Sequence, residues 1–262
     1  MDDQIPSAGW RVVPVSVTGS EHLRRGVENQ DAFAHRSSGD RLVLAVADGA
    51  GSAARSATGA RLAVDAACDA ATAIAPPDPG RAGRAVQARR WAERALGLFD
   101  RRLTRLIDES GGERRDYATT LLAVVARPPA LVFLAVGDSF LVVEHRNAGA
   151  HLIVAPDNGT SRASTVFLTS ADRASAVRCG VLEDAEITGL ALCSDGMLDA
   201  VLATGPDADG RSTLLAPADF TNYLRMFADR SARPADLAER LRSPDFTASS
   251  ADDKTMVLVT RP

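Results

Sequence analysis

The sequence has little cysteine and no long apolar run. Its three cysteines, Cys68, Cys179 and Cys193, form no CxxC pair. So small and odd a set excludes a disulfide framework and a cysteine-based zinc site, and it favours a reducing compartment. No apolar stretch approaches the ~20 residues that span a bilayer, and the acidic start of the chain is not followed by an apolar segment. We therefore expect a soluble, cytoplasmic protein without a signal peptide.

The sequence also lacks an excess of positive charge. Its net charge of −4 provides no overall attraction to nucleic acid or to an anionic membrane. Arginines do gather between residues 81 and 105, but Glu93, Asp100 and Asp108 lie nearby. This pattern favours a solvated helix face over a nucleic-acid-binding patch. We expect neither nucleic acid nor a membrane as a partner.

Length and composition are those of an ordinary globular protein. The chain has 262 residues, of which 45% are hydrophobic and 24% are charged, so a sizeable core can form. No internal repeat, low-complexity tract or linker is visible. We predict one domain over residues 1–262, and a monomer.

Apolar patterns predict an α+β protein. Alternating or continuous apolar runs predict strands over residues 10–19, 32–36, 41–47, 117–126, 130–136, 140–145, 150–154, 188–193 and 255–260. Helical spacing predicts helices over residues 52–74, 83–109, 197–203, 216–229 and 234–241. The short turns within 117–154 predict an antiparallel meander, and the polar segment 156–187 is predicted as loop with short pieces. Strands and helices come in runs, which is typical of α+β layers.

Acidic side chains stand at the ends of several predicted strands. They occur in four groups, Asn29-Gln30-Asp31, Asp48-Gly49-Ala50-Gly51, Ser194-Asp195-Gly196 and Asp252-Asp253. A carboxylate at the end of a buried strand is costly unless it is paired or holds a metal. Four such strand ends that meet in one fold would make an all-oxygen site for hard divalent cations.

The two Asp-Gly pairs sharpen this hypothesis, although Asp-Gly by itself is a common turn. The glycines let the backbone approach a ligand closely and leave the Gly49 carbonyl free to coordinate. Carboxylates of Asp48, Asp195 and Asp252 on neighbouring strand ends would repel one another without a cation. Two Mg²⁺ or Mn²⁺ ions would relieve that repulsion, lower the pKa of a bridging water and clamp the oxygens of a phosphate.

Six short elements, in their order along the chain, resemble the motifs of the metal-dependent serine/threonine protein phosphatases of type 2C, the PPM family, in its compact bacterial form. They are Asn29-Gln30-Asp31, Asp48-Gly49-Ala50-Gly51, Thr119-Thr120-Leu121-Leu122, Gly137-Asp138-Ser139, Ser194-Asp195-Gly196 and Asp252-Asp253-Lys254-Thr255. Each element is weak alone, but the ordered set spans nearly the whole chain. The resemblance implies two packed antiparallel sheets with helices on both outer faces, an α-β-β-α sandwich, in agreement with the predicted order of elements.

The resemblance also implies roles for individual residues. Asp48 would bridge two metal ions, and the Gly49 carbonyl would complete one of the two shells. Asp195 and Asp252 would bind the other ion, while Asp31 would act through metal-bound waters.

A third, weaker ion is implied as well, held by Asp138 together with Asp195, so that two or three Mg²⁺ or Mn²⁺ ions are expected. The implied reaction is hydrolysis of phosphoserine or phosphothreonine by a metal-activated hydroxide, without a covalent phosphoenzyme. Asp48 and Asp195 are the aspartates that we expect to be catalytic. The implied partners are a phosphoprotein substrate and a Ser/Thr kinase or its targets.

The chain departs from the family's pattern near Asp31. Gln30 stands where Glu is common, and the neutral amide lowers the negative charge of the site. The family's phosphate-binding arginine usually lies five residues before this aspartate, where the chain has Gly26. A loop shift of one residue would bring Arg25 to that contact, and the planar fork of an arginine suits two phosphate oxygens. Arg25 is therefore the third residue predicted to be catalytic.

Alternatives remain for several of these residues. Asp138 could instead cap a hairpin turn, and Asp253 is the alternative to Asp252. His22 could protonate a leaving alkoxide and Asp199 could be a ligand, but both are expected at the surface. The departures near Asp31 also leave open a pseudophosphatase, which would bind a phosphoprotein or a kinase and catalyse little. A receiver-type acidic domain is disfavoured because the chain lacks alternating βα units.

Overall fold

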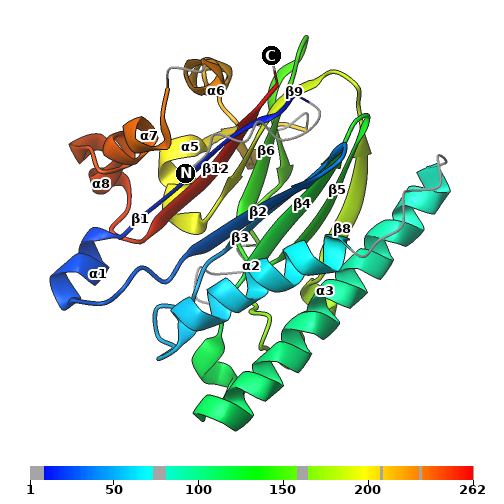
Figure 1. Ribbon diagram of the computed structural model, residues 1–262. Helices are drawn as coiled ribbons and strands as arrows, with labels where there is room; N and C mark the ends of the chain where they lie inside the picture. The colour runs from blue at the N-terminus through cyan, green and yellow to red at the C-terminus, as the bar shows by residue number, and fades with distance from the viewer. Residues whose placement is uncertain (1–8, 73–80, 158–164, 207–208, 230–231, 262) are drawn as a thin grey trace.

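Two antiparallel sheets of five strands lie face to face, and helices cover the outer face of each (Figure 1). This computed structural model describes residues 9–72, 81–157, 165–206, 209–229 and 232–261. The layers confirm the predicted fold class, an α+β sandwich of two sheets between helices.

The first sheet has the strand order β1-β12-β9-β6-β7. Its strands are Arg11–Val17 (β1), Phe140–His145 (β6), Gly149–Val154 (β7), Ile187–Cys193 (β9) and Lys254–Thr260 (β12). Strand β12 pairs with both β1 and β9. Segments from the two ends of the chain therefore lie side by side in this sheet (Figure 1).

The second sheet has the strand order β2-β3-β4-β5-β8. Its strands are Ala32–Ser38 (β2), Arg41–Ala47 (β3), Leu121–Arg127 (β4), Ala130–Val136 (β5) and Arg178–Glu183 (β8). A separate hairpin consists of Ala203–Pro206 (β10) and Ser212–Leu215 (β11).

The described residues form eight α-helices and two 3-10 turns. They are Ser20–Arg25 (α1), Ser56–Thr72 (α2), Arg81–Ser110 (α3), Arg173–Ala176 (α4), Leu198–Val201 (α5), Phe220–Ala228 (α6), Pro234–Leu241 (α7) and Pro244–Ser249 (α8), with 3-10 turns at Arg114–Tyr117 (η1) and Asp195–Met197 (η2). Helices α2 and α3 cover the second sheet, and α6 and α7 cover the first (Figure 1). Within the described ranges, no helix combines the length and apolarity that a membrane span requires.

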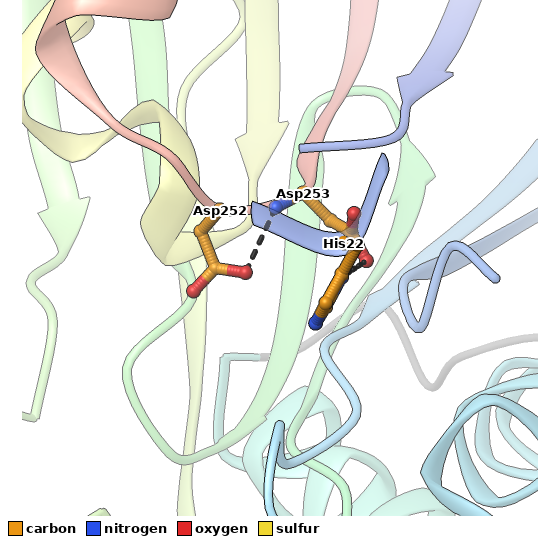
Figure 2. A group of neighbouring side chains, drawn as sticks. All are labelled: His22, Asp252 and Asp253. Atoms are coloured by element: carbon orange, nitrogen blue, oxygen red, sulfur yellow. Dashed lines mark hydrogen bonds and ion pairs between the residues drawn. The ribbon is translucent and has the colours of Figure 1, made fainter. Parts of the chain in front are cut away.

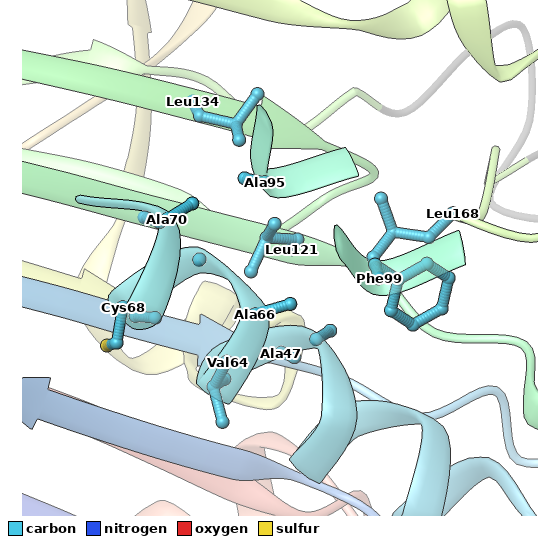
Figure 3. Packing of buried hydrophobic residues seen from close by; sticks show 14 of the residues in the cluster. Ala47, Val64, Ala66, Cys68, Ala70, Ala95, Phe99, Leu121, Leu134 and Leu168 are labelled. Atoms are coloured by element: carbon cyan, nitrogen blue, oxygen red, sulfur yellow. The ribbon is translucent and has the colours of Figure 1, made fainter. Parts of the chain in front are cut away.

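Three apolar layers hold the sandwich together. The middle layer, between the sheets, includes Trp10, Leu44, Leu122 and Val257. The layer under α6 and α7 forms against the first sheet. The layer under α2 and α3 is rich in alanine (Figure 3). Small side chains let α2 approach the second sheet closely, and the long arginine-rich helix α3 then packs beside α2.

The sequence predicts strands β3, β5 and β6 with the bounds that the structure has. The predicted meander over 117–154 is wrong. Strands β4 and β5 pair in the second sheet, whereas β6 and β7 pair in the first. The turn at Gly137-Asp138-Ser139 carries the chain from the second sheet to the first. Turn residues alone do not reveal whether the next strand pairs with the preceding strand or enters the other sheet.

Further elements lie where the sequence predicts none. Strand β8 falls in the segment predicted as loop, and helices α1 and α8 and the β10–β11 hairpin are also unpredicted. These elements are short, and β8 is a half-buried edge strand without clear alternation. The predicted strand over 117–126 begins later, at Leu121, because η1 precedes it. The single domain over residues 1–262 stays a prediction.

We predict that Gly59→Ala destabilises the protein by about 1–3 kcal/mol, the usual range for overpacking. A Cβ on Gly59, in α2, would lie 2.2 Å from the carbonyl oxygen of Tyr117, and neither backbone can yield freely. Gly97→Ala is the matched control, because its Cβ meets only the end of the Arg101 side chain, at 3.3 Å. We expect Gly97→Ala to be neutral or stabilising. Urea unfolding of both variants measures the difference, and equal stabilities would contradict this account.

Candidate metal centre

Strand pairing brings the predicted acidic residues to one edge of the sandwich. In the second sheet, Ala32 pairs with Ala47, so Asp31 and Asp48 are neighbours at the ends of β2 and β3. In the first sheet, Cys193 at the end of β9 pairs with Met256 of β12 and with Phe140 of β6. Asp195, Asp252 and Asp138 flank these three strands at the same edge.

Three of these carboxylates converge closely. Asp48, Asp138 and Asp195 each place one carboxylate oxygen within 4.8 Å of the others. A cleft of about 330 Å³ opens beside them and is lined by Asp138, Asp195, Asp199 and Asp252, among others. The cleft therefore leads from the protein surface to the carboxylate cluster.

Burial and mutual repulsion disfavour ionisation of this cluster. Burial, reinforced by Asp253 and Asp195, raises the pKa of Asp31 to about 7. Burial also raises the pKa of Asp195 to about 6, and that of Asp48 well above its usual value. The pKa of Asp138 is raised as well, again chiefly by burial. Four carboxylates with this shift need protons or cations as counter-charges.

The cluster fits a hard divalent cation. Buried Oδ1 atoms of Asp31, Asp138 and Asp195 have no hydrogen-bond partner among the described residues. Unpartnered buried carboxylate oxygens are unfavourable unless an ion or water uses them. All the donors are oxygens, which suits Mg²⁺ or Mn²⁺ better than softer metals.

Threonine and serine hydroxyls hold the aspartates in place. The Asp48 N–H donates to Thr120 Oγ1 (3.0 Å), and Thr119 Oγ1 donates to the Asp48 carbonyl (3.0 Å). Ser194 Oγ donates to Asp31 Oδ2 (2.8 Å). The sequence reveals these residues as parts of motifs, but their positioning role is visible only in the fold. Outer contacts of this kind orient the ligands of metal sites.

The Asn-x-Asp spacing has a local explanation. Asn29 Oδ1 accepts the N–H of Asp31 (2.9 Å), and Asn29 Nδ2 donates to Ser16 Oγ (2.9 Å) at the end of β1. Asn29 thus fixes the turn before Asp31 and ties it to the first sheet. Gln30 is 8% exposed, and its Oε1 is among the buried oxygens without a partner in the described part of the chain.

The two aspartates before β12 differ in environment. Asp252 is exposed and lines the cleft. Asp253 is 2% exposed, and its Oδ1 and Oδ2 accept the N–H groups of Gly19 (2.7 Å) and Gln30 (2.6 Å). Asp253 therefore fastens the N-terminal segments to the start of β12, while Asp252 faces the cleft. The ligand role of Asp252 stays a prediction.

His22 is not the surface residue that we expected. It is 6% exposed, and its Nδ1 lies 2.9 Å from Asp253 Oδ2 (Figure 2). The reason is the unpredicted helix α1, whose first turn packs on the loop before β12 through the Glu21 N–H and the Ala251 carbonyl (3.1 Å). Asp199, expected at the surface, is exposed and lines the cleft.

Arg25, predicted to bind phosphate, is the last residue of α1 and is exposed. No hydrogen bond or ion pair between described residues joins it to the acidic cluster. The structure explains the neighbouring departure from the family pattern. Gly26 ends α1 in a left-handed conformation with φ of 65°, and its N–H contacts the carbonyls of His22 and Leu23. Glycine suits such a helix end, whereas arginine would be strained there. The catalytic role of Arg25 stays a prediction.

A carboxylate cluster at the edge of a helix-flanked β-sandwich is the arrangement that we expected of a metal-dependent phosphatase. The family model described as "Protein phosphatase 2C" matches residues 18–242. The chain belongs to the protein phosphatase 2C family, a family of metal-dependent protein phosphatases. The predicted family and class of hydrolase are therefore confirmed.

Similar proteins span almost the whole chain. "Serine/threonine-protein phosphatase 3" of Escherichia coli (strain K12) is 27% identical over 95% of this chain and 97% of its own length. The serine/threonine phosphatase Stp1 of Staphylococcus aureus has a similar structure, with a TM-score of 0.67 and 15% identity over 98% of this chain and 97% of Stp1. The catalytic domain of PstP, solved with two manganese ions, has a TM-score of 0.60 and 16% identity, over 96% of this chain and 97% of the PstP domain. At such identities the solved structures support the fold alone.

We predict that the cation-free protein loses stability as pH rises from about 5 to 7.5. The folded state holds protons on Asp31 and Asp195 up to about pH 7 and 6, whereas the unfolded chain releases them near 3.8. The folded state therefore binds more protons in this window, and the free energy of unfolding falls with rising pH. Thermal unfolding in EDTA measures the fall, and Mn²⁺ should abolish it by replacing the protons. A melting temperature that rises over this window in EDTA would contradict the prediction.

We also predict that Asp253→Asn costs about 1–3 kcal/mol of stability, the usual cost of leaving a buried donor unsatisfied. An asparagine would turn one of the two acceptor oxygens into an NH₂ group facing the N–H of Gly19 or Gln30. The control is Asp245→Asn on the exposed side of α8, which should be neutral. Urea unfolding measures the stabilities of the two variants. Equal midpoints would show that the hydrogen bonds of Asp253 with Gly19 and Gln30 do not stabilise the fold.

Proposed function

We propose that this protein hydrolyses phosphoserine and phosphothreonine in proteins at a centre of two or three Mg²⁺ or Mn²⁺ ions. The observation that carries the proposal is the convergence of Asp48, Asp138 and Asp195 within 4.8 Å, with buried oxygens that lack partners in the described residues. The name of the E. coli relative, a serine/threonine phosphatase, supports the choice of phosphoamino acid. The manganese ions in the PstP structure support the choice of metal.

The protein's own residues supply position and charge. Asp48, Asp195 and Asp252, together with the Gly49 carbonyl, would hold the cations. Asp31, held by Ser194, would orient water. When bound, the cations supply Lewis acidity and activate a water molecule for direct attack on phosphorus. The carboxylates themselves neither attack the phosphate nor become phosphorylated in this proposal.

The phosphate and the protein that carries it would approach through the cleft beside Asp138 and Asp252. Arg25, on the exposed end of α1, would bind the phosphate after a shift of the loop that follows it. We further propose that the protein acts as a monomeric, single-domain cytoplasmic enzyme, and that its partners are a Ser/Thr kinase or the targets of one.

A pseudophosphatase is the second candidate. Two features favour it. Gln30 is neutral where the type 2C pattern commonly has Glu, and no hydrogen bond or ion pair joins Arg25 to the carboxylate cluster among the described residues. Such a protein would bind a phosphoprotein or a kinase with little turnover.

We predict that the wild-type protein hydrolyses a phenyl phosphate ester in the presence of Mn²⁺, and that Asp48→Asn lowers kcat/KM by more than about 100-fold. Loss of even an outer contact at a metal site typically costs 10–100-fold, and Asp48 lies among the proposed ligands. The matched control is Asp108→Asn on the exposed face of α3, which should retain wild-type activity.

A panel of phosphoserine, phosphothreonine and phosphotyrosine peptides, with Mn²⁺ titrated, extends the test. Preference for the first two supports the proposal. If the wild-type protein shows no turnover above Asp48→Asn at saturating Mn²⁺ but binds a phosphopeptide, the pseudophosphatase reading replaces it.

A further inference from the structure

The turn that carries Asp138 joins the two sheets and is tightly packed. Gly137 has φ of 97°, and a Cβ there would lie 2.6 Å from Thr120 Cγ2. Ser139 Oγ lies 3.3 Å from Thr120 Oγ1, which also accepts the Asp48 N–H. Asp138 itself is 8% exposed. A displacement of this turn would therefore move one carboxylate of the cluster relative to Asp48.

Arg178, the first residue of β8, holds this turn from the other side. Its Nη2 donates to the Gly137 carbonyl (2.7 Å), and its Nη1 donates to the Ala155 carbonyl (2.6 Å), just after β7. The guanidinium thus connects an edge strand of the second sheet with the turn and with the end of a strand of the first. Arg178 pairs with Ala135 in the second sheet, and Leu141 pairs with Val154 in the first. The guanidinium therefore lies where the ends of these two pairings meet.

The Asp138 side chain has further contacts that fix its direction. Thr165 Oγ1 donates to Asp138 Oδ2 (2.6 Å), while Oδ1 is buried without a partner among the described residues. Burial lowers the pKa of Arg178, and the negative charges of Asp157 and Asp138 oppose that shift. One oxygen of Asp138 is therefore held, and the other is left for a ligand.

We propose that Arg178 is a positioning residue for Asp138, and that its two-pronged hydrogen bonding to Gly137 and Ala155 keeps the Asp138 carboxylate directed at Asp48 and Asp195. This inference rests on the proposed function, in which Asp138 helps to hold a cation. Arg178 touches neither the cation nor the substrate and acts through the turn.

The geometry requires arginine in particular. A guanidinium carries several N–H donors in one rigid plane and can serve two carbonyls at once, whereas an ammonium on a flexible stem is a point charge. By positioning Asp138, Arg178 would strengthen cation binding. Its positive charge would weaken cation binding, because a positive group near the cluster repels Mn²⁺. Positioning and charge therefore predict different results for two substitutions.

The experiment is a double-mutant cycle read by isothermal titration with Mn²⁺. Arg178→Lys keeps the charge and loses the fork, and Arg178→Gln loses both. If Arg178 positions Asp138, each variant weakens the weakest Mn²⁺ binding step by about 10–100-fold, the range for outer contacts at metal sites. Asp138→Asn weakens the same binding step. The double variant Arg178→Lys/Asp138→Asn binds Mn²⁺ no more weakly than Asp138→Asn alone, because both changes act on the same carboxylate.

The control is Arg146→Gln, which removes an equal charge from an exposed ion pair with Glu186 and should leave the Mn²⁺ isotherm unchanged. Thermal unfolding in EDTA shows that each variant is folded. Unchanged binding in Arg178→Lys, tighter binding in Arg178→Gln, or additive losses in the cycle would overturn the role of Arg178. So would loss of the folded state in both variants, since Arg178 would then support the whole fold. Absence of Mn²⁺ binding by the wild-type protein would overturn the proposed function as well, which separates the two failures.

Discussion

The burial of several carboxylates close together is the constraint on which the rest of this structure depends. Burial raises the pKa of Asp31, Asp48, Asp138 and Asp195, and the negative charges of neighbouring aspartates add to the effect. A cluster of this kind destabilises the fold when it is ionised and free of cations. The apolar burial in the three layers of the sandwich offsets the cost of this cluster. A cation bound at this cluster would remove the penalty, so the proposed function implies that metal binding and stability are coupled.

The geometry of the cluster is held by close packing of the backbone. A Cβ on Gly19 would lie 2.3 Å from the backbone carbon of Asp252, and one on Gly196 would lie 1.9 Å from the Asp253 carbonyl oxygen. Hydroxyls of Thr120 and Ser194 add hydrogen bonds to the aspartate-bearing loops. The carboxylates are thus positioned before any ligand arrives, which is what electrostatic catalysis requires.

Much of the fold and of the candidate site could be predicted because the relevant signals are local. Continuous apolar runs predict β3, β5 and β6 with their observed bounds, and acidic residues at strand ends identify Asp48 and Asp195. The meander prediction failed because a Gly-Asp-Ser turn looks the same whether the chain pairs back or crosses to another sheet. His22 and Arg178 were missed as structural contacts because their partners, Asp253 and Gly137, lie far away in the sequence.

The sequence by itself determined the periodicities of the elements, the acidic residues at the strand ends and the resemblance to type 2C phosphatases. It did so because strand patterns, helix patterns and short motifs depend only on residues that are close together in the sequence. Only the tertiary structure decided which strands share a sheet, that Asp252 faces the cleft while Asp253 is buried, and that Arg178 braces the Asp138 turn. These features depend on contacts between distant segments, and only the packing of two sheets brings those segments together.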